Sequence, residues 1–224
     1  MMSAAADARA DSLQSRHYSP RHYSLILFDL DEVLVDYDHR ARLELLAARS
    51  GSTCEQVHAA LIDSGLEHES DLGDWLPESY AHELSRRLAA PVSLKDCVDA
   101  RAASMRVRPA MLDLAQRAAQ RARVAILTNN GLYLRDALPV TCPELFPLFT
   151  GAVRYGAEFH RLKPDPEVYL RCVASLDAKP DQVLFIDDRA QNVTGAIEAG
   201  LDAVRFISPG ILKEVFVQRG VIDR

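Results

Sequence analysis

Two aspartates, Asp29 and Asp31, directly follow an apolar run at residues 25–28. In an extended segment alternate side chains share a face, so the two carboxylates can point the same way. Two neighbouring negative charges repel each other unless a cation or a proton lies between them. The pair therefore predicts a functional site, whereas the simpler interpretation is a loop in which one aspartate caps the next helix.

Two further apolar runs, at residues 124–127 and 183–186, also end in polar side chains. The polar residues that follow these runs are Thr128 and Asn129, and Asp187 and Asp188. Short apolar runs of this kind are typical of buried strands in a parallel sheet, whose carboxyl ends meet at one edge. Several carboxylates at that edge, without nearby His or Cys, predict a Mg²⁺ site rather than a zinc site.

The strands that would position these side chains alternate with helical patterns. A further strand is expected at 203–206 and a short one at 149–153, and helices are expected to start at Pro109 and Pro166. Alternating strands and helices predict an α/β fold, here a Rossmann-like three-layer core around a parallel sheet.

Residues 37–105 carry only helical patterns. Thr53 with Gln56 forms a capping box, Ser93 can cap a later helix, and Gly51 can end the first one. We therefore expect an inserted all-helical cap at 37–105 over a core at 23–36 and 106–224. Because the insertion follows the carboxyl end of the first strand, it should act as a lid over the site.

The composition indicates a soluble globular protein. The chain has 224 residues, is 48% hydrophobic and has a net charge of −6. No segment is apolar enough to span a bilayer, and the basic residues are scattered, so we expect neither a membrane nor a nucleic acid as partner. The four cysteines form no Cys-x-x-Cys pair, which favours reduced thiols and a cytoplasmic location. Residues 1–22 lack an apolar signal-peptide core and are expected to form a flexible tail.

Four short motifs, in this order, resemble those of the haloacid dehalogenase-like hydrolases. They are Asp29-Leu30-Asp31, Thr128, Lys163 within Lys-Pro-Asp-Pro at 163–166, and Asp187-Asp188 within the run at 185–192. Each motif alone is weak: Thr128 could cap a helix, Lys163 could be a surface charge, and Asp187-Asp188 could form a turn. Together they resemble the phosphatase-type members of the family that carry an inserted helical cap.

The resemblance implies a role for each of these residues in phosphate-ester hydrolysis. Asp29 would be the nucleophile that forms an aspartyl-phosphate, and Asp31 would be the general acid and then the general base. Thr128 and the Asn129 amide would hold phosphoryl oxygens, and Lys163 would bridge Asp29 and the phosphoryl group.

The same resemblance implies a set of Mg²⁺ ligands. The carboxylates of Asp29 and Asp188 and the backbone carbonyl of Asp31 would bind the ion, which would neutralise charge during the attack. Asp187 would be an outer-shell partner. Asn192 is expected to be a supporting residue.

The chain departs from the family pattern beside the nucleophile, where Glu32 replaces the usual glycine. This extra carboxylate could disfavour an anionic substrate, or it could point to solvent. In the loop before Lys163, His160 and Arg161 are candidate substrate contacts, with exposed loop charge as the alternative. Candidate specificity contacts in the cap, with helix-surface charge as the alternative, are Asp38, His39, Arg40 and Arg42.

The predicted function is Mg²⁺-dependent hydrolysis of a small phosphorylated metabolite by a monomer or homodimer. Dehalogenases of the family replace the second motif aspartate with a non-acidic residue, so Asp31 favours phosphoryl transfer. The alternatives are a 2-haloacid dehalogenase or a phosphomutase of the same fold, or a catalytically silent binding protein.

Overall fold

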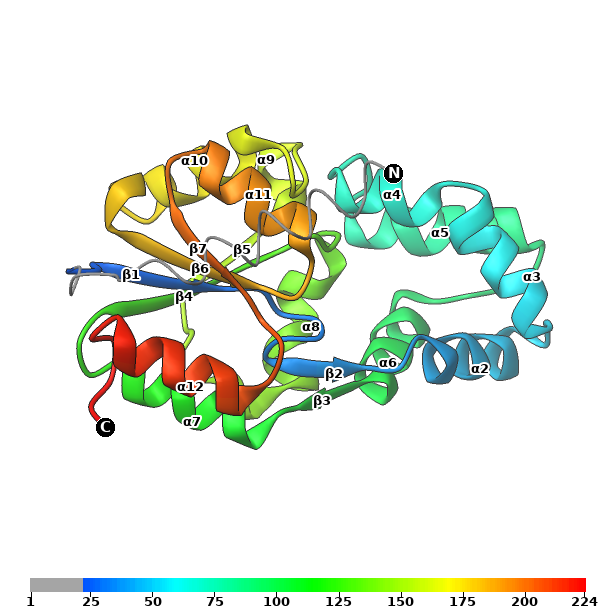
Figure 1. The fold of residues 1–224 in the computed structure, drawn as a ribbon. Helices are drawn as coiled ribbons and strands as arrows, with labels where there is room; N and C mark the ends of the chain where they lie inside the picture. Colours follow the sequence, from blue (N-terminus) through cyan, green and yellow to red (C-terminus); the bar gives the residue numbers. More distant parts are fainter. Residues whose placement is uncertain (1–21) are drawn as a thin grey trace, which may run out of the picture.

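The computed structural model describes residues 22–224. Its centre is a five-stranded sheet in the order β5-β4-β1-β6-β7, with every neighbouring pair parallel (Figure 1). The strands are β1 (Leu25–Phe28), β4 (Arg123–Thr128), β5 (Val153–Tyr155), β6 (Val183–Asp187) and β7 (Asp202–Arg205). Except for His22, the predicted N-terminal tail lies outside the described residues.

Helices cover both faces of this sheet because its central strands are apolar on both sides. Along β1, Ile26 and Phe28 pack with one group of helices, and Leu25 and Leu27 pack with another. The first group is α7 (Pro109–Ala118), α8 (Tyr133–Thr141) and α12 (Pro209–Gln218); the second is α10 (Pro166–Ser175) and α11 (Ala190–Glu198). Figure 1 shows α7 and α12 on the opposite side of the sheet from α10 and α11. The predicted α/β, three-layer core is confirmed.

The inserted segment is helical and has its own hydrophobic cluster, which includes Leu46, Leu61 and Leu84. Its helices are α2 (His39–Ser50), α3 (Cys54–His58), the π-helix η1 (Ala59–Asp63), α4 (Leu66–Asp71), α5 (Pro77–Leu88) and α6 (Leu94–Ser104). The capping box of Thr53 and Gln56 is confirmed, as are the Ser93 cap and the left-handed Gly51 that ends α2. We call this helical insertion the cap.

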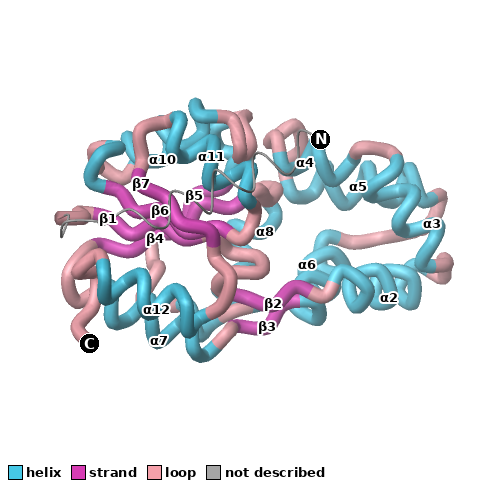
Figure 2. The backbone as a smooth tube through the Cα atoms, in the orientation of Figure 1, coloured by secondary structure: helices cyan, strands magenta, loops and turns pink. Residues whose placement is uncertain are grey.

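A two-stranded antiparallel ribbon, β2 (Val35–Tyr37) with β3 (Met105–Val107), joins the cap to the core. Figure 2 shows it as a short magenta segment between the large sheet and the cap helices. The sequence analysis did not predict this ribbon, because each strand has only three residues and its burial alternates. The predicted strand at 149–153 lies too early, since β5 starts at Val153.

The remaining elements are short: α9 (Gly156–Phe159), η2 (Pro143–Leu145) and η3 (Pro180–Gln182). Over residues 22–224, each helix is too short or too polar to cross a bilayer.

Candidate active site

The carboxyl ends of β1, β4 and β6 bring the predicted polar residues together. The Asp29 N–H donates to the Ile186 carbonyl at 2.8 Å, which continues the β1–β6 pairing to the point where both strands end. Asp29 is buried, and its Oδ1 accepts a hydrogen bond from the Leu30 N–H at 2.7 Å. The nucleophile predicted from the sequence is therefore held by the backbone of its own strand end.

Lys163 is the cation among these carboxylates. Its Nζ lies 2.7 Å from Asp29 Oδ1 and 2.8 Å from Asp187 Oδ2, and it donates to the Leu127 carbonyl at 3.1 Å. The backbone of Lys163 is fixed by the Asn129 side chain, which accepts from the Lys163 N–H and donates to its carbonyl, each at 2.9 Å. Asn129 thus uses its amide side chain to position the lysine.

Three carboxylates, those of Asp29, Asp187 and Asp188, each offer an oxygen within 4.8 Å of the others. Burial, together with the negative charge of Asp187, raises the pKa of Asp29 well above its usual range, although Lys163 opposes this shift. Burial and the same neighbour raise the pKa of Asp188. These directions mean that burial and mutual repulsion outweigh the effect of Lys163 on the two carboxylates, and a cation bound between them would relieve that repulsion.

Asp187 is less available to an ion than the other two carboxylates. It is fully buried, Lys163 binds its Oδ2, and the Asn192 amide donates to both of its oxygens at 3.0 Å. The Arg189 N–H donates to its Oδ1 at 2.9 Å. Asn192 is thus a supporting residue of the site, as expected from the sequence.

Asp31 contacts two residues that the sequence analysis did not select. Its Oδ2 accepts a hydrogen bond from Arg101 of α6 at 2.6 Å and from Asn130 at 3.1 Å. Asn130 also donates to Thr128 Oγ1 at 2.7 Å, so Thr128 joins the same network. The position of Asn130, directly after Thr128-Asn129, is a signal that could have identified it; Arg101 lies within a helical pattern that gives no such signal.

Glu32 is turned toward Arg108 rather than left unpaired. Its Oε2 lies 2.7 Å from Arg108 Nη2, and its Oε1 accepts from the Tyr37 N–H at 3.1 Å. The backbone of Glu32 is left-handed, with φ 61°, a conformation that suits glycine. The ion pair reduces the effect of this extra negative charge on an approaching anion.

The candidate specificity residues of the cap are engaged in contacts within the cap. Asp38 caps α2 by accepting from the Ala41 N–H at 3.0 Å, and the exposed Arg40 pairs with Glu44. The buried Arg42 forms a two-pronged ion pair with Glu67 at 2.6 and 2.8 Å.

Two of the remaining candidates, His39 and His160, contact the ribbon or the cap, and Arg161 pairs within its own loop. The His39 ring packs edge-on against Tyr37 and His58. His160 Nδ1 lies 2.9 Å from the Leu72 carbonyl, a contact between the core and the cap, and Arg161 lies 3.4 Å from Asp165.

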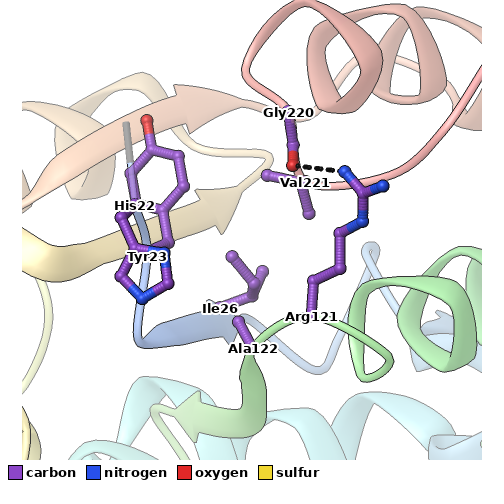
Figure 3. Close-up of a pocket in the computed structure, with 7 residues that line it drawn as sticks. All are labelled: His22, Tyr23, Ile26, Arg121, Ala122, Gly220 and Val221. Atoms are coloured by element: carbon purple, nitrogen blue, oxygen red, sulfur yellow. Dashed lines mark hydrogen bonds between the residues drawn. The ribbon is translucent and has the colours of Figure 1, made fainter. Parts of the chain in front are cut away.

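A cavity of about 200 Å³ opens at this site. Its lining residues are Asp29, Asp31, Glu32, Thr128, Asn129, Lys163, Asp188, Arg189 and Asn192. A larger cavity, of about 280 Å³, lies beside Tyr23 and Ile26, toward the start of β1 (Figure 3). Its lining has no carboxylate, and Arg121 there donates to the Gly220 carbonyl. The charged groups that can do chemistry are therefore at the smaller cavity.

The sequence profile of the haloacid dehalogenase-like hydrolases matches residues 23–200. This chain belongs to that family. A phosphatase of Mycobacterium tuberculosis is 27% identical over 190 residues, which cover 80% of this chain and 85% of that protein. Flavin mononucleotide hydrolase 1 of Arabidopsis thaliana is 50% identical over 44 residues, 20% of this chain and 18% of that protein.

Solved structures of the family share the fold. A family enzyme of Bacteroides thetaiotaomicron, in complex with magnesium and inorganic phosphate, has a TM-score of 0.68 and 19% identity, covering 82% of this chain and 93% of its own. The L-2-haloacid dehalogenase of Xanthobacter autotrophicus, with chloropropionic acid covalently bound, has a TM-score of 0.59 and 19% identity, covering 89% and 84%. The chain is thus a hydrolase of this family, with phosphatases among its relatives.

Proposed function

We propose that this hydrolase is a magnesium-dependent phosphatase that cleaves a small phosphomonoester through a phosphate bound to Asp29. The observation that carries the proposal is the buried Lys163 ammonium, held 2.7 Å from Asp29 beside a cavity that Thr128 and Asn129 also line. A fixed cation next to a carboxylate nucleophile can stabilise the negative charge of the phosphoryl group during its transfer. Asp31 supplies the acid–base group that hydrolysis of an ester requires.

The carboxylates of the site fit a magnesium ion. Their oxygens are hard donors, they lie close together, and Lys163 balances only part of their charge. Asp29, Asp188 and the Asp31 carbonyl would hold the ion, and Asp187, which is already engaged by Lys163 and Asn192, would act from the outer shell. When bound, magnesium would neutralise charge so that one anion can approach another.

The residues of this chain then act in two steps. An Asp29 oxygen attacks phosphorus while the bond from phosphorus to the leaving oxygen breaks, and Asp31 gives that oxygen its proton. Asp31 next takes a proton from a water whose oxygen attacks phosphorus, and the bond to Asp29 breaks. Inorganic phosphate leaves, and both aspartates return to their first state.

The substrate class is a small phosphorylated metabolite, because the cap lies over the carboxyl edge of the sheet and limits the space above the site. The first test is release of inorganic phosphate from p-nitrophenyl phosphate and from a panel of phosphorylated metabolites that includes flavin mononucleotide. We expect phosphate release that a chelator abolishes and that magnesium restores. Chloride release from 2-haloacids without metal would contradict the proposal, and so would binding of phosphate without turnover across the panel.

We also propose that the cap covers residues 37–105 and that the core comprises 23–36 and 106–224. Both boundaries then lie at the β2–β3 ribbon, where the chain passes between the two hydrophobic clusters. Size-exclusion chromatography with light scattering would decide between the expected monomer and homodimer.

A further inference from the structure

We propose that Arg101 of the cap and Asn130 of the core are positioning residues for Asp31. They hold one oxygen of its carboxylate and so fix the direction of the group that exchanges a proton with the leaving group and with water. The inference rests on the proposed function, because it assigns a task within phosphate-ester hydrolysis. It adds that the acid–base group is complete only when the cap lies against the core.

The hydrogen bonds distinguish the two oxygens of Asp31. Oδ2 accepts from Arg101 Nη2 at 2.6 Å and from Asn130 Nδ2 at 3.1 Å. The two donors are joined to each other, since Arg101 Nη2 also donates to Asn130 Oδ1 at 3.0 Å. Oδ1 is buried and has no hydrogen-bond partner among residues 22–224. The contacts of Oδ2 therefore fix the direction of the carboxylate, whose side chain is still 26% exposed at the cavity.

Arg101 reaches this position only across the interface between the cap and the core. It lies on α6, and its side chain is 2% exposed. Its guanidinium packs over the Tyr37 ring at 4.2 Å, which fixes its plane beside the ribbon. If the cap moved away from the core, Arg101 would leave Asp31, and Asn130 would be the remaining donor to Oδ2.

Stability alone is a poor reason for such a contact. A buried ion pair loses most of its gain to the cost of removing both charges from water, and apolar residues of similar size often stabilise a protein as well. Arg101 also leaves its buried Nε without a partner within the described part of the chain. An arginine that leaves one of its own donors unpaired while it holds the Asp31 carboxylate is better explained by positioning.

The proposed chemistry needs the Asp31 carboxyl group in one direction for both steps. In the first step its proton passes to the leaving oxygen as the bond from that oxygen to phosphorus breaks. In the second step a proton of the attacking water passes to Asp31, which restores the acid. An Asp31 side chain free to rotate would spend part of its time turned away from the leaving oxygen.

The test compares two leaving groups in the full-length enzyme. p-Nitrophenolate departs without a proton, whereas the alkoxide of glycerol 2-phosphate needs one. We expect Arg101→Met to lower kcat/KM for both substrates, and the loss for glycerol 2-phosphate should be larger by about 10-fold or more. This difference is part of the roughly 10²–10⁴-fold rate enhancement that general acid catalysis supplies. Arg101→Lys keeps a charged donor and should recover part of that difference.

The matched control is Arg87→Met. Arg87 is also a poorly exposed cap arginine, but it binds Glu69 and Glu83 within the cap at 2.7 and 2.6 Å. Its replacement should change kcat/KM for both substrates by the same factor. If Arg101→Met does not fold, Asn130→Ala removes the other donor to Oδ2 and should show the same selective loss.

Two results would overturn the inference. One is an equal loss of kcat/KM for both substrates in Arg101→Met. This is the result expected if Arg101 only holds the cap on the core and has no effect on Asp31. The same criterion applies to Asn130→Ala if that variant replaces Arg101→Met. The other is unchanged kinetics with both substrates. A wild-type enzyme that releases no phosphate from either compound or from the metabolite panel would instead refute the proposed function itself, so the two failures are distinguishable.

Discussion

Lys163 Nζ lies 2.7 Å from Asp29 Oδ1, and both groups are shielded from water. The same ammonium binds Asp187 at 2.8 Å, so one cation joins the ends of two adjacent strands. Within the described site, this contact places the positive charge directly against the candidate nucleophile. On the proposed function, we expect Lys163 to share its positive charge between Asp29 and the incoming phosphoryl oxygens.

Asp29→Asn should abolish phosphate release while the melting temperature stays the same or rises. The substitution removes the nucleophile, so we expect turnover to fall on the order of 10⁴-fold or more. It also removes one of several crowded negative charges, and Lys163 keeps Asp187 as its partner. Phosphate release and thermal unfolding measure the two effects, with the exposed Asp181→Asn as the control. Substantial activity in Asp29→Asn would show that another group attacks phosphorus.

Magnesium should raise the melting temperature, and Asp188→Asn should remove most of that rise. A ligand at 100 times its Kd stabilises the folded state by about 2.7 kcal/mol. We expect this because the Asp188 carboxylate lies within 4.8 Å of those of Asp29 and Asp187. Thermal unfolding in MgCl₂, against NaCl of the same ionic strength, measures the shift without use of activity. An equal shift in wild type and Asp188→Asn would place the ion elsewhere.

The stability of the cap should fall in acid through Glu83. Hydrogen bonds from Arg86 and Arg87 lower the pKa of Glu83 from 4.5 to about 2. As the pH falls, Glu83 is protonated in the unfolded chain before it is protonated in the folded chain. Its contribution to the free energy of unfolding is therefore complete above about pH 4.5 and is lost as the pH falls toward 2. Thermal unfolding of wild type and Glu83→Gln should therefore differ most near neutral pH and converge in acid. A difference independent of pH would contradict this expectation.

Gly131→Ala should weaken the docking of the cap on the core. A Cβ at Gly131 would lie 2.1 Å from Ser70 Oγ and 3.2 Å from Ser70 Cβ on α4, so the hydroxyl must rotate away and α4 must give slightly. We expect a loss of about 1–3 kcal/mol in the free energy of unfolding, as for other overpacked contacts. Gly210→Ala is the matched control, since nothing lies within 4 Å of its new Cβ.

The same contact can be tested from the cap side. Ser70 Oγ is buried without a hydrogen-bond partner among the described residues, so Ser70→Ala alone should change stability little. Combined with Gly131→Ala, Ser70→Ala should restore part of the lost free energy of unfolding. Urea unfolding of wild type, the two single variants and the double variant gives the coupling energy between the two residues. Additive effects would indicate that the two residues do not press on each other.

Glu32→Gly and Glu32→Ala should separate two effects of Glu32 on stability, that of its left-handed backbone and that of its charge. Glycine relieves a left-handed conformation that costs other residues about 1–2 kcal/mol, but it loses an ion pair with Arg108 worth up to about 1 kcal/mol. We therefore expect Glu32→Gly to be as stable as wild type within about 1 kcal/mol, and Glu32→Ala to be less stable. Urea unfolding of the three proteins measures these differences. An alanine variant as stable as the glycine variant would show that the left-handed backbone at position 32 is not strained.

The sequence predicted the central strands and the residues at their ends because both are encoded locally. β1 and β6 are buried on both faces, so they appear as unbroken apolar runs, and a polar side chain after each run marks the edge of the sheet. The ribbon strand β2 was missed since its burial alternates over three residues. Lys163 lies in a loop and was selected only through the resemblance of its motif.

The contacts between the cap and the core could not be predicted in the same way. Arg101 is 70 positions from Asp31, and its helix gives no sign of which core residue it faces. The pairing of Glu32 with Arg108 spans 76 positions and depends on the ribbon, which brings the two segments together. These contacts follow from tertiary packing, which periodicity and capping patterns do not encode.

Val35 and Val107 are paired across the ribbon, so the insertion leaves and re-enters the core at neighbouring points. An insertion with adjacent ends can be exchanged or lengthened during evolution without displacing the strand ends that hold Asp29 and Thr128, or the loop that holds Lys163. On the proposed function, the part of the gene that encodes the cap can then diverge and select a different alcohol, while the residues at the ends of the core strands stay unchanged. Arg101 is the exception, since every new insertion must supply a substitute for it or leave Asp31 with Asn130 alone.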